Sequence, residues 1–348
     1  MHKHRWNHLQ LDLLLEPEGG LLIKAGSSPL DPTRPDMSFV RTTHPATGEE
    51  TIYLPGSSLK GVLRSHAERL IRSALGEAAC WTCDPLQSRG RDALCSSHWR
   101  TREARRMSAA QIYARSCLAC RTFGHTRLAS RLLAADAFPL RPVTRLPVRQ
   151  GVSIDRKTGR SSGKALYDLE VAPTGTVFRV QLQMHNFELW QVGLLAQVLQ
   201  EMDEGWVRVG YGKSRGLGRV RLVFTRLRLA YFAPSSADEA AWRGVAALAL
   251  AASREPYRLL ETGAEGPRPA VLSIKSQPDG HHLSPLGSIW RWGLEEPLLW
   301  GQEPASQPGL GAAHQTITAV LQRVQAAWAN LVQSPPQAPA TCGEEWLG

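Results

Sequence analysis

Hydrophobic residues recur along this chain with two periods. They alternate with polar residues at 9–15 and 176–184, and 219–230 has the same character, which predicts strands that each bury one face. Apolar residues three and four positions apart predict amphipathic helices at about 57–74 and 188–202. The order strand, helix, strands, helix, strand predicts an α+β protein with a ferredoxin-like, RRM-like sheet.

Three stretches interrupt this pattern. A long proline-rich loop runs from 26 to 48, and an irregular, arginine-rich region covers 80–120. The strand-like segment 144–154 leads into a turn-rich stretch at 155–159. Connections of such length are usually functional or disordered. We expect the second and third of these stretches to be large insertions in the core.

The composition changes after Phe232. Residues 233–348 hold 6 of the 11 tryptophans and 12 of the 23 prolines, and helices are expected near 238–252 and 315–333. We expect a core at 1–232 and a partly helical C-terminal extension at 233–348 that serves as a subunit-docking arm. Its tryptophans are expected in core or interface positions.

The basic charge is concentrated in the first two-thirds of the chain. The formal net charge is +10, and residues 60–131 carry 14 Lys and Arg against 5 Asp and Glu, whereas 233–348 carries 7 against 11. Such a field attracts polyanions; the alternative is a solvated surface that keeps the protein in solution. No run of about 18 apolar residues occurs, and the first residues lack the apolar centre of a signal peptide. We therefore expect a cytoplasmic protein without a membrane partner.

The cysteines predict a structural Zn²⁺ site. Cys80 and Cys83 form one Cys-x2-Cys pair, Cys117 and Cys120 form another, and Cys95-x2-His98 lies between them. Thiolates at this spacing suit tetrahedral zinc. The two Cys-x2-Cys pairs are the preferred ligands, with Cys95 and His98 as alternates. Reduced cysteines without metal and a thioredoxin-type redox role are the competing interpretations.

Two segments are candidates for binding phosphate. Pro55-Gly56-Ser57-Ser58 stands at an expected helix start, where free N–H groups and the helix dipole favour anions, and Lys60 and Arg64 follow one turn later. The glycine-rich stretch 210–220 allows close approach to a sugar-phosphate chain and carries Lys213 and Arg215. An ordinary serine cap and a mere turn are the alternatives. The spacing is not that of a Walker A loop, so ATP binding is not expected.

Four motifs in order carry a family resemblance: Leu-Pro-Gly-Ser-Ser-Leu-Lys-Gly-x2-Arg at 54–64, Cys-x2-Cys-x2-Phe-Gly at 117–124, Val-Ser-Ile-Asp-Arg-x-Thr-Gly at 152–159, and Ser-Arg-Gly-Leu-Gly at 214–218. Together they resemble the RAMP superfamily of CRISPR-associated proteins. The resemblance is greatest to the guide-RNA-binding backbone subunits of type III effector complexes. It covers about residues 9–232.

The resemblance implies an RRM-like core with a helical, zinc-bearing insertion at about 76–135. It also implies a thumb hairpin at about 147–166, around Ile154 and Arg156, that interrupts the guide-target duplex. The implied partners are CRISPR RNA, single-stranded target RNA and other effector subunits. The residues matching the family's guide-binding segments are Ser57, Ser58, Lys60, Arg64, Lys213, Ser214 and Arg215.

The resemblance also implies a candidate catalytic residue. Backbone subunits of this type commonly cut target RNA with an acidic residue in the loop before the Pro-Gly-Ser-Ser helix, and Asp36 matches it, with Asp31 as second choice. A carboxylate there can position Mg²⁺ or Mn²⁺ on the scissile phosphate or help activate the 2′-hydroxyl. Two alternatives stay open: a non-catalytic backbone subunit in which these aspartates only favour turns, and a stand-alone nuclease that processes precursor guide RNA through His125.

Overall fold

The structure is a computed structural model of the chain. It describes residues 5–26, 35–76, 80–84, 95–98, 106–232, 241–243, 262–263, 266–267, 271–273, 280–284 and 287–336. Asp31 and most of the expected helix at 238–252 lie outside these ranges.

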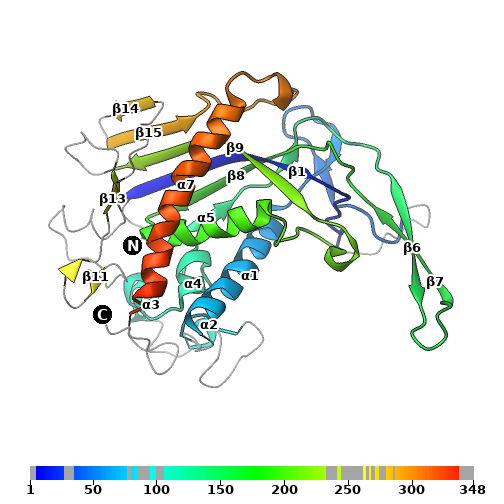
Figure 1. The fold of residues 1–348 in the computed structure, drawn as a ribbon, viewed down its shortest axis with the longest axis horizontal. Coiled ribbons are helices and arrows are strands. Elements are labelled where there is room, and N and C mark those ends of the chain that lie inside the picture. The colour runs from blue at the N-terminus through cyan, green and yellow to red at the C-terminus, as the bar shows by residue number, and fades with distance from the viewer. Residues whose placement is uncertain are drawn as a thin grey trace.

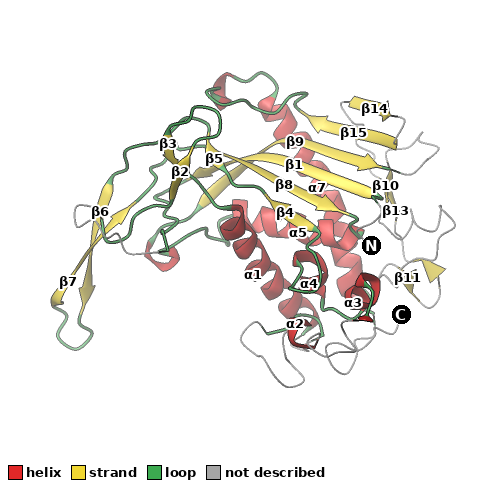
Figure 2. Cartoon of the chain, turned by 180° about the vertical axis from the view of Figure 1, so that it is seen from behind, coloured by secondary structure: helices red, strands yellow, loops and turns green. Residues whose placement is uncertain are grey.

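One antiparallel sheet organises the chain, with the strand order β14-β15-β9-β1-β8-β4 (Figures 1 and 2). Its central part is made of β1 (Asn7–Pro17), β4 (Leu132–Ala134), β8 (Phe178–His185) and β9 (Val220–Tyr231). Helix α1 (Gly56–Leu75) follows the first of these strands and α5 (Leu189–Asp203) follows the third. In chain order the four strands lie as 4-1-3-2, which is the ferredoxin-like topology, so the predicted fold class is confirmed.

The helices cover one face of this sheet (Figure 2). The alternation in β1 places Leu9, Leu11 and Leu13 beneath them, each almost fully buried. On the same face, α5 buries most of its residues because it packs against α1, β9 and α7 (Leu310–Gln333), and α7 also contacts β9 directly. Among the helices in the described ranges, none has the length and apolar character needed to span a bilayer.

The C-terminal extension contributes to this same core. β15 (Gly287–Gly293) pairs with the second half of β9, and β14 (Gly280–Ser284) pairs with β15. The first half of β9 has its backbone N–H groups bonded by side chains, since Leu222 N donates to Asp203 Oδ1 at 2.6 Å and Phe224 N donates to His314 Nδ1 at 3.1 Å. The expected helix at 315–333 forms the greater part of α7. A docking role for the extension stays a prediction.

Two insertions leave the core, as the sequence predicted. The first holds α2 (Cys95–His98), α3 (Ala109–Ala114) and α4 (Leu118–Phe123), with α4 against α1. The second is a long hairpin of β6 (Val148–Ile154) and β7 (Ser161–Glu170) that protrudes from the body of the molecule (Figure 1). It occupies the segment expected for the thumb, and we use that name for it below. The remaining short elements are β2 (Arg41–Thr43), β3 (Glu50–Ile52), β5 (Phe138–Pro139), β10 (Ala241–Arg243), β11 (Thr262–Gly263), β12 (Gly266–Pro267), β13 (Val271–Ser273) and the one-turn helices Lys213–Arg215 and Pro304–Ser306.

Candidate nucleic-acid interface and metal centre

Helix α1 begins at Gly56, one residue before the serines expected to cap it. Pro55 occupies the N-cap position and makes no side-chain cap, and the N–H of Gly56 donates to Asp136 Oδ1 at 2.7 Å. A Cβ at position 56 would lie 2.2 Å from the carbonyl oxygen of Ala134, so only glycine fits beneath β4. The helix start is thus partly occupied by a carboxylate of the protein, and the expectation that its first N–H groups are all free is wrong for Gly56.

The outer face of α1 nevertheless concentrates positive charge. Ser57 is exposed, while Ser58 and Lys60 are half-buried. Burial, together with the neighbouring charge of Arg64, lowers the pKa of Lys60. A lysine crowded in this way gains from an external anion, because the anion relieves the repulsion between the two cations.

Arg64 is bonded to the protein on three sides. Its Nε donates to Glu68 Oε1 at 2.8 Å, its Nη1 to the carbonyl oxygen of Gly124 at 3.0 Å, and its Nη2 to Cys120 Sγ at 3.5 Å. Burial opposes its charge, but the Cys120 sulfur and Glu68 outweigh burial and raise the pKa of Arg64. Arg64 therefore links α1 to the cysteine cluster, and a guide contact would be an additional role for it.

The glycine-rich loop is a fixed platform. Gly210, Gly212, Gly216 and Gly218 all have positive φ, and a Cβ at Gly218 would lie 2.0 Å from the carbonyl oxygen of Val209. Its backbone is bonded to the segment after β1, with Tyr211 N donating to the carbonyl oxygen of Leu22 at 2.7 Å and Gly218 N to that of Gly20 at 2.9 Å. This anchoring turns Lys213, Ser214 and Arg215 outward, and all three are exposed.

Aromatic and cationic side chains connect this loop to the thumb. The Arg215 guanidinium donates from Nη1 to the Tyr167 hydroxyl at 3.1 Å and lies 5.4 Å from the centre of that ring and 5.8 Å from the centre of the Tyr211 ring. Lys24 Nζ lies 6.0 Å from the Tyr211 ring. Burial, together with the charge of Arg69 on α1, lowers the pKa of Lys213. The loop therefore joins the cations of α1 to the base of the thumb.

The thumb presents apolar side chains to solvent. Ile154 is 56% exposed and Leu166 is 72% exposed, and Val152 pairs with Leu166 across the hairpin. At the tip, Asp155 Oδ1 accepts hydrogen bonds from the N–H groups of Lys157 and Thr158, both at 2.8 Å, which lowers the pKa of Asp155 and fixes the turn. Arg156 is exposed in that turn.

Asp36 lies at the base of the thumb. Its carboxylate is exposed and accepts a hydrogen bond at Oδ2 from the N–H of Asp168 in β7, at 3.2 Å. The next residue bridges to β7 as well, since Met37 N donates to the carbonyl oxygen of Asp168 and Met37 O accepts from Glu170 N, both at 3.0 Å. This loop is therefore fixed to β7, and it presents a free carboxylate edge beside the thumb.

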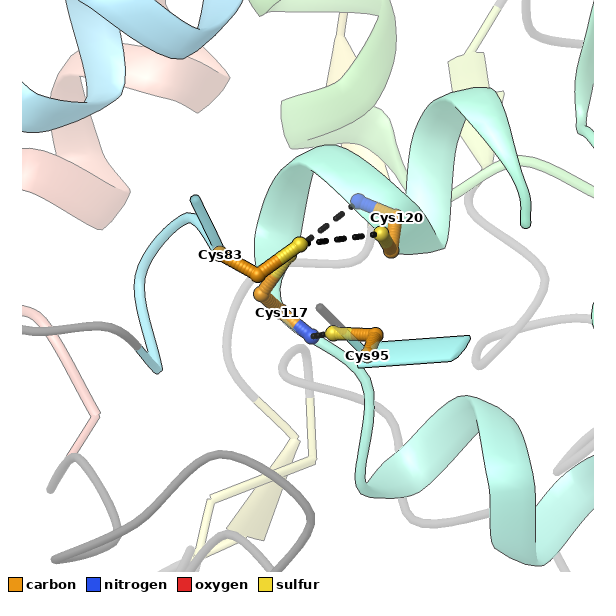
Figure 3. Close-up of side chains that lie close together, drawn as sticks. All are labelled: Cys83, Cys95, Cys117 and Cys120. Atoms are coloured by element: carbon orange, nitrogen blue, oxygen red, sulfur yellow. Dashed lines mark hydrogen bonds between the residues drawn. The ribbon is translucent and has the colours of Figure 1, made fainter. Parts of the chain in front are cut away.

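Four buried cysteines converge in the first insertion (Figure 3). The sulfurs of Cys83, Cys95, Cys117 and Cys120 all lie within 4.8 Å of one another, and Cys83 Sγ is 3.7 Å from Cys120 Sγ. Sulfurs about 2.3 Å from a tetrahedral zinc ion lie about 3.8 Å apart, so the cluster fits this ion. Hydrogen bonds from the other cysteines lower the pKa of Cys83, whereas burial raises the pKa of Cys117.

Comparison with known proteins identifies the family. A sequence profile described as the RAMP superfamily matches residues 39–221. The chain belongs to the RAMP superfamily. Among solved structures, a chain described as "Type IV-B CRISPR Complex" resembles this RAMP protein at 16% identity and a TM-score of 0.39, covering 62% of this chain and 90% of that one. A likeness this distant carries no argument about function. Among curated proteins, none matches the sequence.

In this RAMP protein the cysteine cluster differs by one member from the set preferred from spacing. Cys83, Cys117 and Cys120 are present as predicted, and Cys95, an alternate, occupies the place expected for Cys80. Cys80 is buried nearby in the chain, and His98 ends α2. Among the residues that the structure describes, this is the only set of three or more His, Cys, Asp or Glu side chains close enough to share an ion. Zinc would be held here by four thiolates, a closed site with a structural role.

The sequence did not indicate several residues of the surface formed by α1, the glycine-rich loop and the thumb. Tyr167 and Tyr211 were assigned no role, although each stands beside a motif, and Asp136 and Lys24 lie outside every motif. The contact of Asp136 with Gly56 joins residues 80 positions apart, which no local pattern encodes.

Proposed function

We propose that this chain is an RNA-binding subunit of a CRISPR effector ribonucleoprotein. The guide backbone would lie along α1 and the glycine-rich loop, with Ser57, Lys60 and Lys213 as phosphate contacts. The supporting observation is that cations crowd on this surface, since burial and then the charges of Arg64 and Arg69 lower the pKa values of Lys60 and Lys213. Sequence would be read by base pairing of the guide, while the protein contacts the backbone.

The thumb would contact the guide-target duplex and neighbouring subunits. Its exposed Val152, Ile154 and Leu166 suit insertion beside unstacked bases, and Arg156 at the tip suits phosphate. A type III-like assembly, target RNA and other effector subunits as partners, and a cytoplasmic location all belong to this proposal. Each rests on the motif resemblance together with family membership.

The same proposal includes cleavage of target RNA at Asp36. The carboxylate edge not bonded to Asp168 would position Mg²⁺ or Mn²⁺ on the scissile phosphate or accept the proton of the 2′-hydroxyl. In that reaction the 2′-oxygen bonds to phosphorus, the bond from phosphorus to the 5′-oxygen breaks, and the leaving oxygen takes up a proton. Because Asp36 lies beside the thumb, such a cut would fall next to the point where the thumb would interrupt the duplex.

The test is target-RNA cleavage by the reconstituted complex with Mg²⁺ or Mn²⁺. Asp36→Asn keeps an oxygen that can accept from Asp168 N but removes the charge, and Asp36→Ala removes both. Both variants should lose one discrete cut by about 100-fold or more while guide binding is unchanged. Glu296→Ala is a matched control, because this carboxylate is exposed and lies after β15, outside the thumb and the Asp36 loop. Unchanged cleavage in Asp36→Asn would refute the catalytic role.

The second candidate is a non-catalytic backbone subunit. It is favoured by the hydrogen bond from Asp168 N, because this bond gives Asp36 a structural role in joining its loop to β7. Two results together would support it: the complex with Asp36→Asn still cleaves target RNA, and Asp36→Ala loses guide binding. A nuclease acting through His125 stays a prediction. Both ring nitrogens of His125 have partners in the protein, since Nε2 contacts Ser116 Oγ at 3.1 Å and Nδ1 accepts from Arg127 N at 3.2 Å.

A further inference from the structure

The face of the sheet opposite the helices carries a pocket at the end away from the thumb. Its volume is about 360 Å³, and His8 on β1 and His185 on β8 are among its lining residues. The two histidines are direct cross-strand partners at the start of β1, whereas the thumb protrudes beyond the other end of the sheet (Figure 1). This pocket is therefore separate from the surface of α1 and the glycine-rich loop.

The two imidazole rings form a flat aromatic unit. Their centres are 4.6 Å apart and their planes differ by 17°. Burial, followed by the charge of His185, lowers the pKa of His8 to about 4, so His8 is neutral near pH 7. The stacked pair offers the kind of surface on which a planar heterocycle packs.

A row of hydrogen bonds along the sheet holds the polar groups of the pocket in place. Gln183 Nε2 donates to Gln181 Oε1 at 2.9 Å, and Gln181 Nε2 donates to Asp12 Oδ1 at 2.8 Å. Asp12 is almost fully buried and is paired with Arg226 at 2.8 Å, so this row of side chains is anchored in the sheet. Gln183 also bonds to His8. The Nε2 atom of His8 is buried and has no hydrogen-bond partner within the described part of the chain, which leaves one group free for a ligand.

The rim adds a cation, an aromatic ring and a strained backbone. Arg5 is exposed and Phe232 is half-buried, and Phe232 N donates to the carbonyl oxygen of Trp6 at 3.0 Å. Asn186 has a φ of 49°, the one positive φ at a described residue other than glycine, and its Oδ1 accepts from Trp6 N at 2.8 Å. Backbone strain of this kind concentrates at binding sites.

We propose that this pocket binds one nucleobase of single-stranded RNA. The base would stack against the histidine pair or Phe232, its edge would bond to Gln183 and His8, and Arg5 would contact the adjoining phosphate. β1 and β8 are the two central strands of the ferredoxin-like part, where RNA-binding sheets of this topology carry their stacking residues. The inference rests on the proposed function, because that function supplies the RNA.

The experiment uses the full chain and the four common nucleoside 5′-monophosphates as probes, with binding followed by saturation-transfer NMR. At least one nucleotide should bind to the native chain, and His185→Ala should weaken it roughly tenfold or more. His185→Phe keeps a stacking face and should retain binding, which separates loss of stacking from misfolding. Arg221→Ala is the matched control, because Arg221 projects from the same sheet at its other end and pairs with Glu16.

Three results would overturn the inference: no nucleotide binds to the native chain, His185→Ala binds as the native chain does, or His185→Phe loses binding as fully as His185→Ala. The last result would indicate a ligand held by the imidazole nitrogens, such as a metal ion. The proposed function is tested separately, through binding of a full-length guide RNA to Lys213→Ala. Nucleotide binding without guide binding, or the reverse, distinguishes failure of one proposal from failure of the other.

Discussion

Replacing Cys95 with serine should release the metal that we infer in the first insertion. The sulfur of Cys95 lies in the cluster and accepts the N–H of Cys117 at 3.3 Å, whereas Cys80 is also buried but outside the cluster. Cys80→Ser is therefore a matched control, since both variants place a hydroxyl at a buried position and only one removes a ligand. The comparison separates metal binding from the general cost of a buried polar group.

The magnitude follows from sharing the binding free energy among four ligands. Structural zinc contributes an apparent free energy of about 10–16 kcal/mol, or about 2.5–4 kcal/mol per ligand if the four contribute equally. Loss of one ligand should then weaken zinc binding by roughly 70- to 900-fold. Because binding is coupled to folding of the insertion, the melting temperature of Cys95→Ser should also fall below that of Cys80→Ser.

The assay measures bound zinc by elemental analysis and then by competition with a colorimetric chelator. The native chain and Cys80→Ser should each hold one equivalent and release it at the same chelator concentration, while Cys95→Ser should release it far earlier. Equal release from Cys80→Ser and Cys95→Ser would refute the ligand set. A native chain purified without any zinc after expression with zinc would refute the site itself.

Two further predictions concern stability. Gly218→Ala should lower the free energy of unfolding by about 1–3 kcal/mol more than Gly216→Ala does. Both residues have a φ of 83°, but only at Gly218 would a Cβ meet backbone atoms. Urea unfolding measures the difference, and equal losses of stability in the two variants would contradict the prediction. Stability should fall as pH drops from about 6.5 to about 4, because the unfolded chain protonates His8 in this range while burial, with His185, Arg5 and Arg228, lowers the pKa of folded His8 to about 4. His8→Gln should show a smaller fall over the same range, and identical pH profiles would count against this linkage.

Periodicity located the core elements because apolar residues recur in each one at the spacing of a helix or a strand. The helix expected at 188–202 is α5, displaced by one residue, and the helix expected at 57–74 is α1 with one more residue at each end. The short β4 was not found, since three residues carry no period. β15 was not predicted either, although its pairing with β9 is what ties the extension into the sheet.

The candidate sites were predictable only as far as local chemistry defines them. Spacing identified the cysteines as a metal set, but the choice between Cys80 and Cys95 depends on how α2 packs against α4, which is a tertiary property. The Pro-Gly-Ser-Ser motif predicted the helix start. Glycine is required at position 56, however, because a Cβ there would collide with the backbone of β4. The pocket at His8 lies between residues that are 177 positions apart in sequence, His8 and His185, so no local sequence motif indicates it.

The coverage of β9 restricts how this protein can associate. A twelve-residue strand at the margin of a sheet is a template on which a foreign strand can add, in a complex or in an aggregate. Here β15 covers the second half of that margin, and Asp203 and His314 take up N–H groups of the first half. Backbone pairing at β9 is therefore closed to any neighbour. A copy or partner that contacts this margin must recognise side chains, so its specificity there is open to change by substitution without disturbing the sheet.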